Sequence, residues 1–218
     1  MDRREWEVWD DEHVGRLVKE VWGDVNHRRG RHWELNSRVA KYVEKGDSVL
    51  EIAPGIGHLY GMIRDKVSNY VGLDTSEAMV AQFKFFFPDA EVRYGDAFNL
   101  QDEPVADVVL NVDMLMHIPG DVDLVIKPII GQLWGRAKKR LVFTMRMTPD
   151  EKESWCIQRD YIPMPNEVAD LKKKNMKLTI RAISQSEMKR VLGELQEAES
   201  YYEDYYDERT SIWVVNRR

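Results

Sequence analysis

The sequence predicts an α/β fold in which an open, mostly parallel sheet is doubly wound, with helices on both of its faces. Short apolar runs at residues 48–52, 70–73, 91–94, 106–112 and 140–145 alternate with helical patterns. That alternation is typical of a parallel sheet buried on both sides. Two further strand-like segments, 198–207 and 211–216, follow each other closely enough to pair as an antiparallel hairpin at the C-terminus.

Apolar residues at helical spacing predict the helices that separate these strands. They fall at residues 11–24, 33–44, 76–87, 122–137 and 184–195. We expect a single domain over residues 1–218, with a helical N-terminal cover over residues 1–46. Residues 146–176 break the rhythm with three prolines, and a connection of that length is uncommon without a function, so we predict an inserted lid or substrate region there. A strand is expected to follow at 177–183.

Composition excludes several classes of protein. The 218 residues are 43% hydrophobic, which is enough for a core and rules out a disordered chain. The net charge of −6, with both signs mixed along the chain, argues against a surface made for nucleic acid. Cys156 is the single cysteine, so an internal disulfide and a cysteine-cluster metal site are excluded. With no apolar run of about 20 residues and no signal peptide, we expect a cytoplasmic protein without a metal.

The strongest local signal is a glycine-containing turn directly after the first strand. Glu51 and Ile52 end that strand, and Ala53, Pro54, Gly55, Ile56 and Gly57 follow. Gly55 and Gly57 have no Cβ, so the backbone can approach a ligand closely. The next helix would point its free N–H groups at the same place. The turn therefore predicts a binding site, although such a turn alone is weak evidence for a nucleotide.

Acidic residues also end the second and third strands. Asp74 lies 23 residues after Glu51, which is near the spacing of a ribose-binding carboxylate in a doubly wound fold, and Asp96 ends the third strand. Ligands of open α/β sheets bind outside the carboxyl ends of the strands, so these acids converge on one crevice. The simpler reading is that Asp74 and Asp96 cap the helices that follow them.

Together these features resemble the class I S-adenosylmethionine-dependent methyltransferases of the small-molecule methyltransferase-domain type. Four stretches carry the resemblance, which covers about residues 45–145: VLEIAPGIGHL, VGLDTSEAM, VRYGDAFNL and ADVVLNVDMLMHIP. The closing hairpin, which ends in SIWVVNR, is similar to the last two strands of that family. The resemblance implies a Rossmann-like sheet of seven strands and, as cofactor, S-adenosylmethionine with S-adenosylhomocysteine as its product.

The resemblance also implies where the cofactor lies. Asp74 would accept both ribose hydroxyls, Asp96 the adenine amino group, and Asn111 would lie near the sulfonium. The full set of implied cofactor residues is Glu51, Ala53, Pro54, Gly55, Gly57, Asp74, Thr75, Met79, Asp96, Ala97, Phe98 and Asn111. The chain departs from the family at Ala53, where glycine is usual, and a methyl group there narrows the space beside the methionine end.

The resemblance says less about the residues that would contact the methyl acceptor. Met114 and His117 would border the substrate, and His117 is a candidate base that deprotonates or orients the acceptor. The remaining candidate substrate residues are Trp33, Met147, Trp155 and Tyr161. The last three, with Met145 and Met164, suggest an apolar or aromatic acceptor or ordinary packing. The expected activity is in-line methyl transfer to a small molecule by a monomer or homodimer.

Three other functions share parts of this pattern. A nicotinamide dehydrogenase would share the fold, but its turn needs a third glycine where this chain has His58. An RNA or protein methyltransferase stays open, because basic runs occur at residues 27–31, 138–140 and 172–174. A non-catalytic module of the same fold would have less reason to keep Asp74 and Asp96.

Overall fold

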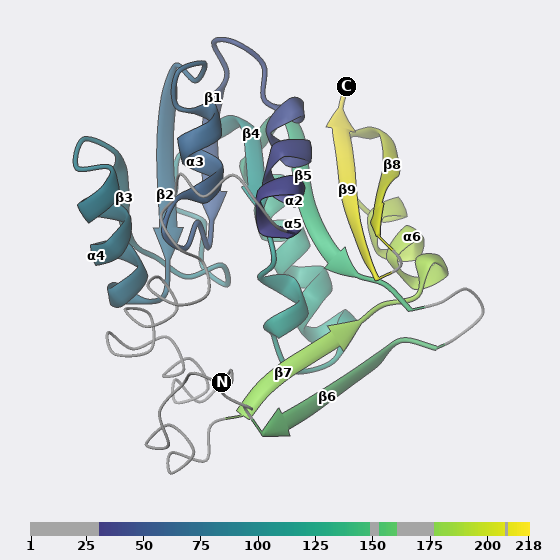
Figure 1. The fold of residues 1–218 in the computed structure, drawn as a ribbon. Helices are drawn as coiled ribbons and strands as arrows, with labels where there is room; N and C mark the ends of the chain where they lie inside the picture. The colour runs from purple at the N-terminus through teal and green to yellow at the C-terminus, as the bar shows by residue number, and fades with distance from the viewer. Residues whose placement is uncertain (1–30, 149–152, 161–176, 208) are drawn as a thin grey trace.

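The protein contains a seven-stranded sheet with the strand order β3-β2-β1-β4-β5-β9-β8 (Figure 1). The structure is a computed structural model that describes residues 31–148, 153–160, 177–207 and 209–218. The strands of the sheet are β1 (Ser48–Ile52), β2 (Asn69–Asp74), β3 (Glu91–Tyr94), β4 (Ala106–Asn111), β5 (Ala137–Arg146), β8 (Ala198–Asp207) and β9 (Thr210–Arg217). Strands β1 to β5 are parallel, and β9 is antiparallel to both β5 and β8. The predicted fold class is confirmed, including the C-terminal hairpin.

Helices cover both faces of this sheet. They are α2 (Arg31–Val39), α3 (His58–Ile63), α4 (Glu77–Phe86), α5 (Lys127–Arg136) and α6 (Gln185–Gly193). Short 3-10 turns lie at η3 (Ala40–Tyr42) and η4 (Leu115–His117), and a π-helical turn, η5 (Val122–Ile126), leads into α5. The two apolar clusters of the core show which helix covers which face: α2, α3 and α4 pack on one, and α5 and α6 on the other.

Alternation along each strand explains why both faces are buried. Val49 and Val108 belong to the cluster under α2, α3 and α4, whereas their neighbours Leu50 and Val109 belong to the cluster under α5 and α6. Successive side chains of a strand point to opposite faces, so an uninterrupted apolar run supplies both clusters. The apolar runs therefore place β1 and β4 in the centre of the sheet.

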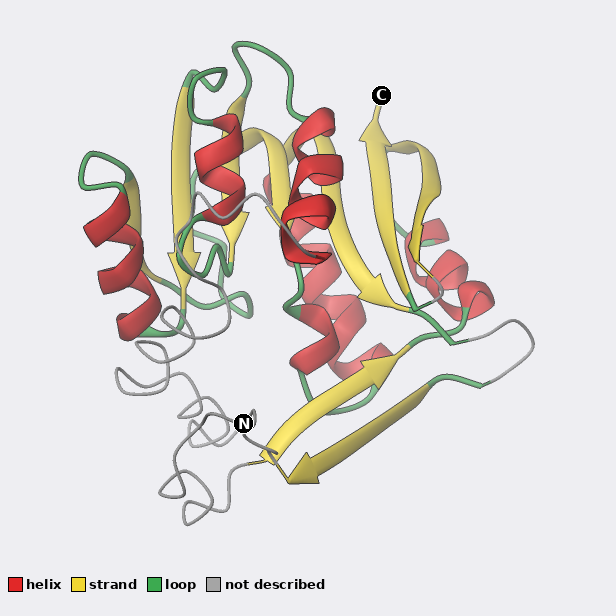
Figure 2. Ribbon diagram, in the orientation of Figure 1, coloured by secondary structure: helices red, strands yellow, loops and turns green. Residues whose placement is uncertain are grey.

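Between β5 and α6 the chain forms a second, two-stranded antiparallel sheet of β6 (Trp155–Asp160), within the predicted inserted region, and β7 (Lys177–Ala182), directly after it. Figure 2 shows it beyond the carboxyl ends of the main strands. Strand β7 contacts η4: His117 Nδ1 lies 3.0 Å from the Thr179 carbonyl oxygen. Arg181, 2% exposed, donates to the carbonyls of Ile118 and Gly120. The second sheet is thus fastened to the loop that follows β4.

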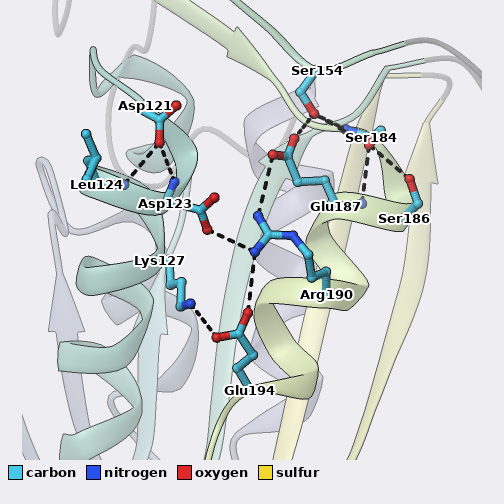
Figure 3. Close-up of polar contacts among 10 residues, drawn as sticks. All are labelled: Asp121, Asp123, Leu124, Lys127, Ser154, Ser184, Ser186, Glu187, Arg190 and Glu194. Atoms are coloured by element: carbon cyan, nitrogen blue, oxygen red, sulfur yellow. Dashed lines mark hydrogen bonds and ion pairs between the residues drawn. The ribbon is translucent and has the colours of Figure 1, made fainter.

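A polar network attaches α6 to the segments around it (Figure 3). Arg190 bridges Asp123 of η5, at 2.9 Å, and the α6 residues Glu187 and Glu194. Ser184 caps α6 by accepting from the Glu187 N–H, while Ser154 accepts from the Ser184 N–H and donates to the Glu187 carboxylate. Since the side chain of Arg190 is 44% exposed, these ion pairs orient the helix more than they stabilise it.

Several expected elements differ in detail from those found. The helix predicted over 33–44 begins at Arg31 and ends in η3, and that over 122–137 begins as the π-helical turn η5. The strand expected at 177–183 exists, but it pairs with β6 and not with the main sheet. The helix predicted over 11–24, most of the expected N-terminal cover and Tyr161 lie outside the described residues. In the part of the chain that is described, no helix has the length and apolarity to cross a bilayer.

Candidate active site

A cleft runs along the carboxyl ends of β3, β2, β1 and β4. Its walls come from the turn after β1, the segments after β2 and β3, the loop after β4, and α2. The residues lining it are His32, Asn36, Glu51 to Ile56, His58, Leu59, Leu73 to Thr75, Met79, Gly95 to Phe98, Val112 to Met114, His117 and Ile118. Since neighbouring strands end side by side, an elongated ligand can contact all four strand ends at once.

The turn after β1 leaves its backbone open to a ligand. Gly55 and Gly57 both have positive φ, +56° and +92°. A Cβ on Gly57 would lie 2.9 Å from the rings of Phe83 and Phe87, so only glycine fits there. A Cβ on Gly55, which lines the cleft, would meet no protein atom within 4 Å. The protein therefore leaves room beside Gly55, while Gly57 holds the turn against α4.

Ala53, the departure from the usual glycine, has a φ of +58°. Its N–H donates to the Leu73 carbonyl at 2.7 Å, which fixes the residue to β2. The left-handed conformation costs an L-residue with a Cβ about 1–2 kcal/mol. Alanine at this position is therefore tolerated under strain, and the glycine preference of the family follows from backbone conformation as well as from space.

Replacing Ala53 by glycine should therefore stabilise the protein. We expect Ala53→Gly to raise the free energy of unfolding by about 1 kcal/mol, because the relief of strain exceeds the added entropy of the unfolded chain. Urea denaturation measures this directly. Ala81, exposed on α4, is the matched control, since Ala81→Gly should lower stability by about 1 kcal/mol. If both substitutions lowered stability alike, the strain at Ala53 would be refuted.

Asp74 lies at the centre of the cleft and is 7% exposed. Its carboxylate accepts from the Gly55 N–H at 3.1 Å and from the Ser76 N–H at 2.9 Å. Burial nevertheless dominates and raises the pKa of Asp74 to about 6, with these bonds opposing the shift. The two backbone bonds fix the orientation of a carboxylate that still borders the cleft, so it can accept hydrogen bonds from a ligand. Helix α4 is capped by Ser76, not by Asp74, which removes the simpler reading of Asp74.

Glu51 is a second buried carboxyl group on the cleft. It is 2% exposed and accepts from the Tyr70 hydroxyl at 2.7 Å. Burial raises the pKa of Glu51 to about 7, the Tyr70 bond lowers it, and the negative charge of Asp74 raises it further. Perturbed carboxyl groups in a cleft are typical of functional sites.

The segment after β3 forms an exposed edge of the cleft. Asp96 accepts from the Phe98 N–H at 2.9 Å, which tightens the turn after β3. Ala97 is buried, while Phe98 is 36% exposed and borders the cleft, and Met79 is buried on its wall. An apolar wall with a carboxylate at its rim is suited to a flat heterocycle that carries a donor group.

The loop after β4 forms the other end of the cleft. His117 is half-buried, and its partial burial lowers the pKa of its imidazole, although the Thr179 carbonyl and the charge of Asp113 oppose the shift. A carbonyl oxygen can only accept, so Nδ1 carries the proton in this contact and Nε2 keeps its lone pair in the neutral ring. His117 therefore has the form of a base at neutral pH.

Most residues predicted to bind the cofactor are brought together in the cleft, but some lie elsewhere. Gly57 and Asn111 are not among the residues that line it. Asn111 is fully buried behind the cleft, where its Nδ2 donates to the Ile52 carbonyl at 2.8 Å and joins β4 to β1. Its Oδ1 has no hydrogen-bond partner in the described part of the chain.

Of the predicted substrate residues, some also line the cleft and others lie elsewhere. Met114 and His117 line the cleft, whereas Trp33, half-buried on α2, does not. Met147 is 7% exposed and belongs to the core cluster under α5 and α6. Trp155 borders a different cleft between β6 and α6, with the Arg146 guanidinium 5.7 Å from the centre of its ring. Burial in the core and attachment to the second sheet take the last two away from the site.

Four polar residues of the cleft were not predicted: His32, Asn36, His58 and Asp113. For Asp113 a signal existed, since it follows β4 by two residues as a further acid near a strand end. His32 and Asn36 reach the cleft only because α2 packs beside α3, and nothing in their local sequence indicates that contact.

Among the described residues, no group of three histidine, cysteine or acidic side chains is arranged to hold a metal ion. The cleft itself gathers acids and no lysine or arginine among the described lining residues. Its chemistry is therefore suited to a cationic or hydrogen-bond-donating ligand.

Comparison with known proteins identifies sequences and structures that are similar to this chain. Residues 50–131 match the model of a methyltransferase domain. A probable S-adenosylmethionine-dependent methyltransferase of Mycolicibacterium smegmatis is 31% identical over 99 residues, which are 44% of this chain and 37% of that protein. The chain thus spans little more than a third of the length of that relative.

Solved structures share the fold over the whole chain. The complex of DhpI with S-adenosylhomocysteine superposes with a TM-score of 0.71 at 16% identity, covering 100% of this chain and 98% of that one. Magnesium protoporphyrin IX methyltransferase from Synechocystis PCC 6803, with bound S-adenosylhomocysteine, gives 0.67 at 15% identity with full coverage of both chains. By its domain match over residues 50–131 and by its fold, the chain is similar to S-adenosylmethionine-dependent methyltransferases.

Proposed function

We propose that the protein is an enzyme that transfers a methyl group from S-adenosylmethionine to a small-molecule acceptor. The observation that carries this proposal is Asp74. Its carboxylate is fixed by the Gly55 and Ser76 N–H groups at the centre of the cleft, beside a turn that leaves space for a ligand. A carboxylate held in this way suits the paired hydroxyls of a ribose.

The proposed cofactor would lie across the strand ends in a fixed direction. Asp96, Ala97 and Phe98 would hold the adenine after β3, and Asp74 with Thr75 the ribose after β2. The amino-acid end would lie along Glu51 and Gly55 after β1, which leaves the loop after β4 for the acceptor. The acids of the cleft match a cofactor that carries a sulfonium and an ammonium group.

Bound S-adenosylmethionine would supply a methyl group that forms a bond to the acceptor as the carbon–sulfur bond breaks and its electron pair stays on sulfur. The protein would contribute mainly by holding the acceptor in line, because positioning supplies much of the acceleration of such displacements. We assign His117 as the base, since its Nε2 holds a lone pair at the acceptor end of the cleft.

Calorimetric titration tests the proposed function without knowledge of the acceptor. S-adenosylhomocysteine should bind with one-to-one stoichiometry, and NAD should give no heat of binding. Binding of NAD alone would overturn the proposal. In the same sample, the ¹⁵N spectrum of the His117 ring, assigned with His117→Gln, should show Nδ1 protonated and Nε2 unprotonated at pH 7. A doubly protonated ring at pH 7 would refute its assignment as the base.

A further inference from the structure

We infer that the β4 end of the cleft is a binding site for an amine, so that the acceptor is an amine that arrives as an ammonium ion. The inference rests on the proposed function and specifies its substrate class. Three side chains carry it, each from a different element: Asn36 of α2, Asp113 of the loop after β4, and His117 of η4. His32 borders the same end.

Asp113 is the anionic group of this site. Its N–H donates to Thr144 Oγ1 at 2.8 Å, and Thr144 is a fully buried residue of β5. Its Oδ2 lies 3.5 Å from His32 Nδ1, a long contact, and its side chain keeps 21% exposure on the cleft. Thr144 Oγ1 also lies 3.5 Å from Asp113 Oδ1, so β5 positions the residue, and its carboxylate still has room for a further hydrogen bond from a ligand.

Asn36 provides an independent sign that a ligand belongs here. It is only 8% exposed and lines the cleft, yet its carboxamide makes no hydrogen bond within the described part of the chain. Its amide atoms are not among the fully buried polar atoms that lack a partner, so the amide faces the open space of the cleft and can bond a ligand there. A ligand group at the β4 end would give this amide its partner.

The charges around the cleft select the class of ligand. Glu51, Asp74, Asp96 and Asp113 line it, and its described walls contain no lysine or arginine. Carboxylate or phosphate acceptors would meet repulsion from these acids, whereas an ammonium would find a charge-assisted bond to Asp113. An ammonium nitrogen has no lone pair to offer, so it must first give a proton to a base. His117 Nε2 is the acceptor of that proton at the same end of the cleft.

The probe for this site is sinefungin, a cofactor analogue in which a carbon bearing an amino group replaces the sulfonium and its methyl. Its ammonium takes the place from which the methyl would leave. We expect the wild-type protein to bind sinefungin about tenfold more tightly than S-adenosylhomocysteine, the effect of one hydrogen bond between charged groups. Titration calorimetry of both ligands at one pH gives the ratio.

Three variants identify the origin of that preference. Asp113→Asn should reduce the ratio to about twofold or less, because it removes the charge while asparagine also tolerates the φ of +55°. Asn36→Ala should reduce the ratio by about threefold through the lost amide contact. Asp96→Asn, at the opposite end of the cleft, should weaken both ligands equally and leave the ratio unchanged. Thermal denaturation verifies that each variant is folded.

Two results would overturn the amine site, and they differ from failure of the proposed function. A wild-type ratio near one, or an Asp113→Asn variant that keeps the wild-type preference, contradicts the site while S-adenosylhomocysteine still binds. Absence of binding for both ligands would contradict the proposed function itself, and the amine site with it.

Discussion

Replacing Asp74 by alanine should weaken the binding of S-adenosylhomocysteine by about 100-fold, the largest effect on binding that we expect from one substitution. Two hydrogen bonds from ribose hydroxyls to a carboxylate would be lost, at roughly 1.5 kcal/mol or more each. In addition, the N–H groups of Gly55 and Ser76 would lose their acceptor, so the turn would be held less firmly. Calorimetric titration measures the change.

Two control variants distinguish the loss of the Asp74 carboxylate from a general loss of folding or affinity. Asp74→Asn keeps one oxygen acceptor and should lose only about tenfold. Asp102, exposed and outside the cleft, provides the matched substitution Asp102→Asn, which should leave the affinity within about twofold. Burial raises the pKa of Asp74 to about 6, so wild-type affinity should also fall as the pH drops below 6 and the carboxylate takes up a proton. Unchanged affinity in Asp74→Ala would refute Asp74 as the ribose-binding group.

Glu51→Gln should make the ligand-free protein more stable at pH 8, by about 2 kcal/mol. Burial raises the pKa of Glu51 from 4.5 to about 7, so the folded protein holds its proton more tightly than the unfolded chain. The stability that this proton contributes is complete below pH 4.5 and is lost as the pH rises through 7. Above pH 7 an ionised Glu51 lies in an apolar site, and each unit of raised pKa corresponds to about 1.4 kcal/mol.

The pH dependence is the decisive part of this prediction. Near pH 4.5 both side chains are largely neutral, and the Tyr70 hydroxyl can donate to either, so the difference in unfolding free energy should be small there and grow toward pH 8. Glu199→Gln on β8 is the control, since Glu199 is exposed and the same substitution should show no such growth. A Glu51→Gln difference that is constant with pH, or that turns destabilising at pH 8, would contradict the assignment.

Local sequence was sufficient to predict the main sheet and one half of the cleft. The apolar run of β1 and the acids that end β1 and β2 are adjacent in the chain to the structures they specify. Parallel strands then bring Glu51 and Asp74 to one edge, whatever the loops between them do. The C-terminal hairpin was predictable for the same reason, since β8 and β9 are neighbours in sequence.

Other features depend on contacts between distant segments. Asn36 and Asp113 meet at one end of the cleft because α2 lies over the sheet, and no local pattern records that.

The regular helix expected over 122–137 begins as a π-helical turn, and Pro128 supplies a reason. Proline has no N–H for the Leu124 carbonyl, so the regular hydrogen-bond ladder is interrupted there. Asn111 was expected to face the ligand as a strand-end residue, but its side chain joins β4 to β1.

One ligand that lies along the strand ends from β3 to β4 would explain all of these expected effects. At Glu51, folding stability and ligand binding then have opposite requirements, because a carboxyl group that can ionise is held in an apolar environment. Glutamine there should give a more stable protein at neutral pH, so the acid at this position is better explained by what binds in the cleft than by the fold.

A crystal structure of the complex with S-adenosylhomocysteine tests this central claim most directly. We expect the adenine beside Asp96 and Phe98, the ribose hydroxyls on Asp74, the homocysteine along Glu51 and Gly55, and the sulfur facing Asp113 and His117. A ligand bound in the reverse direction, or bound outside this cleft, would contradict it.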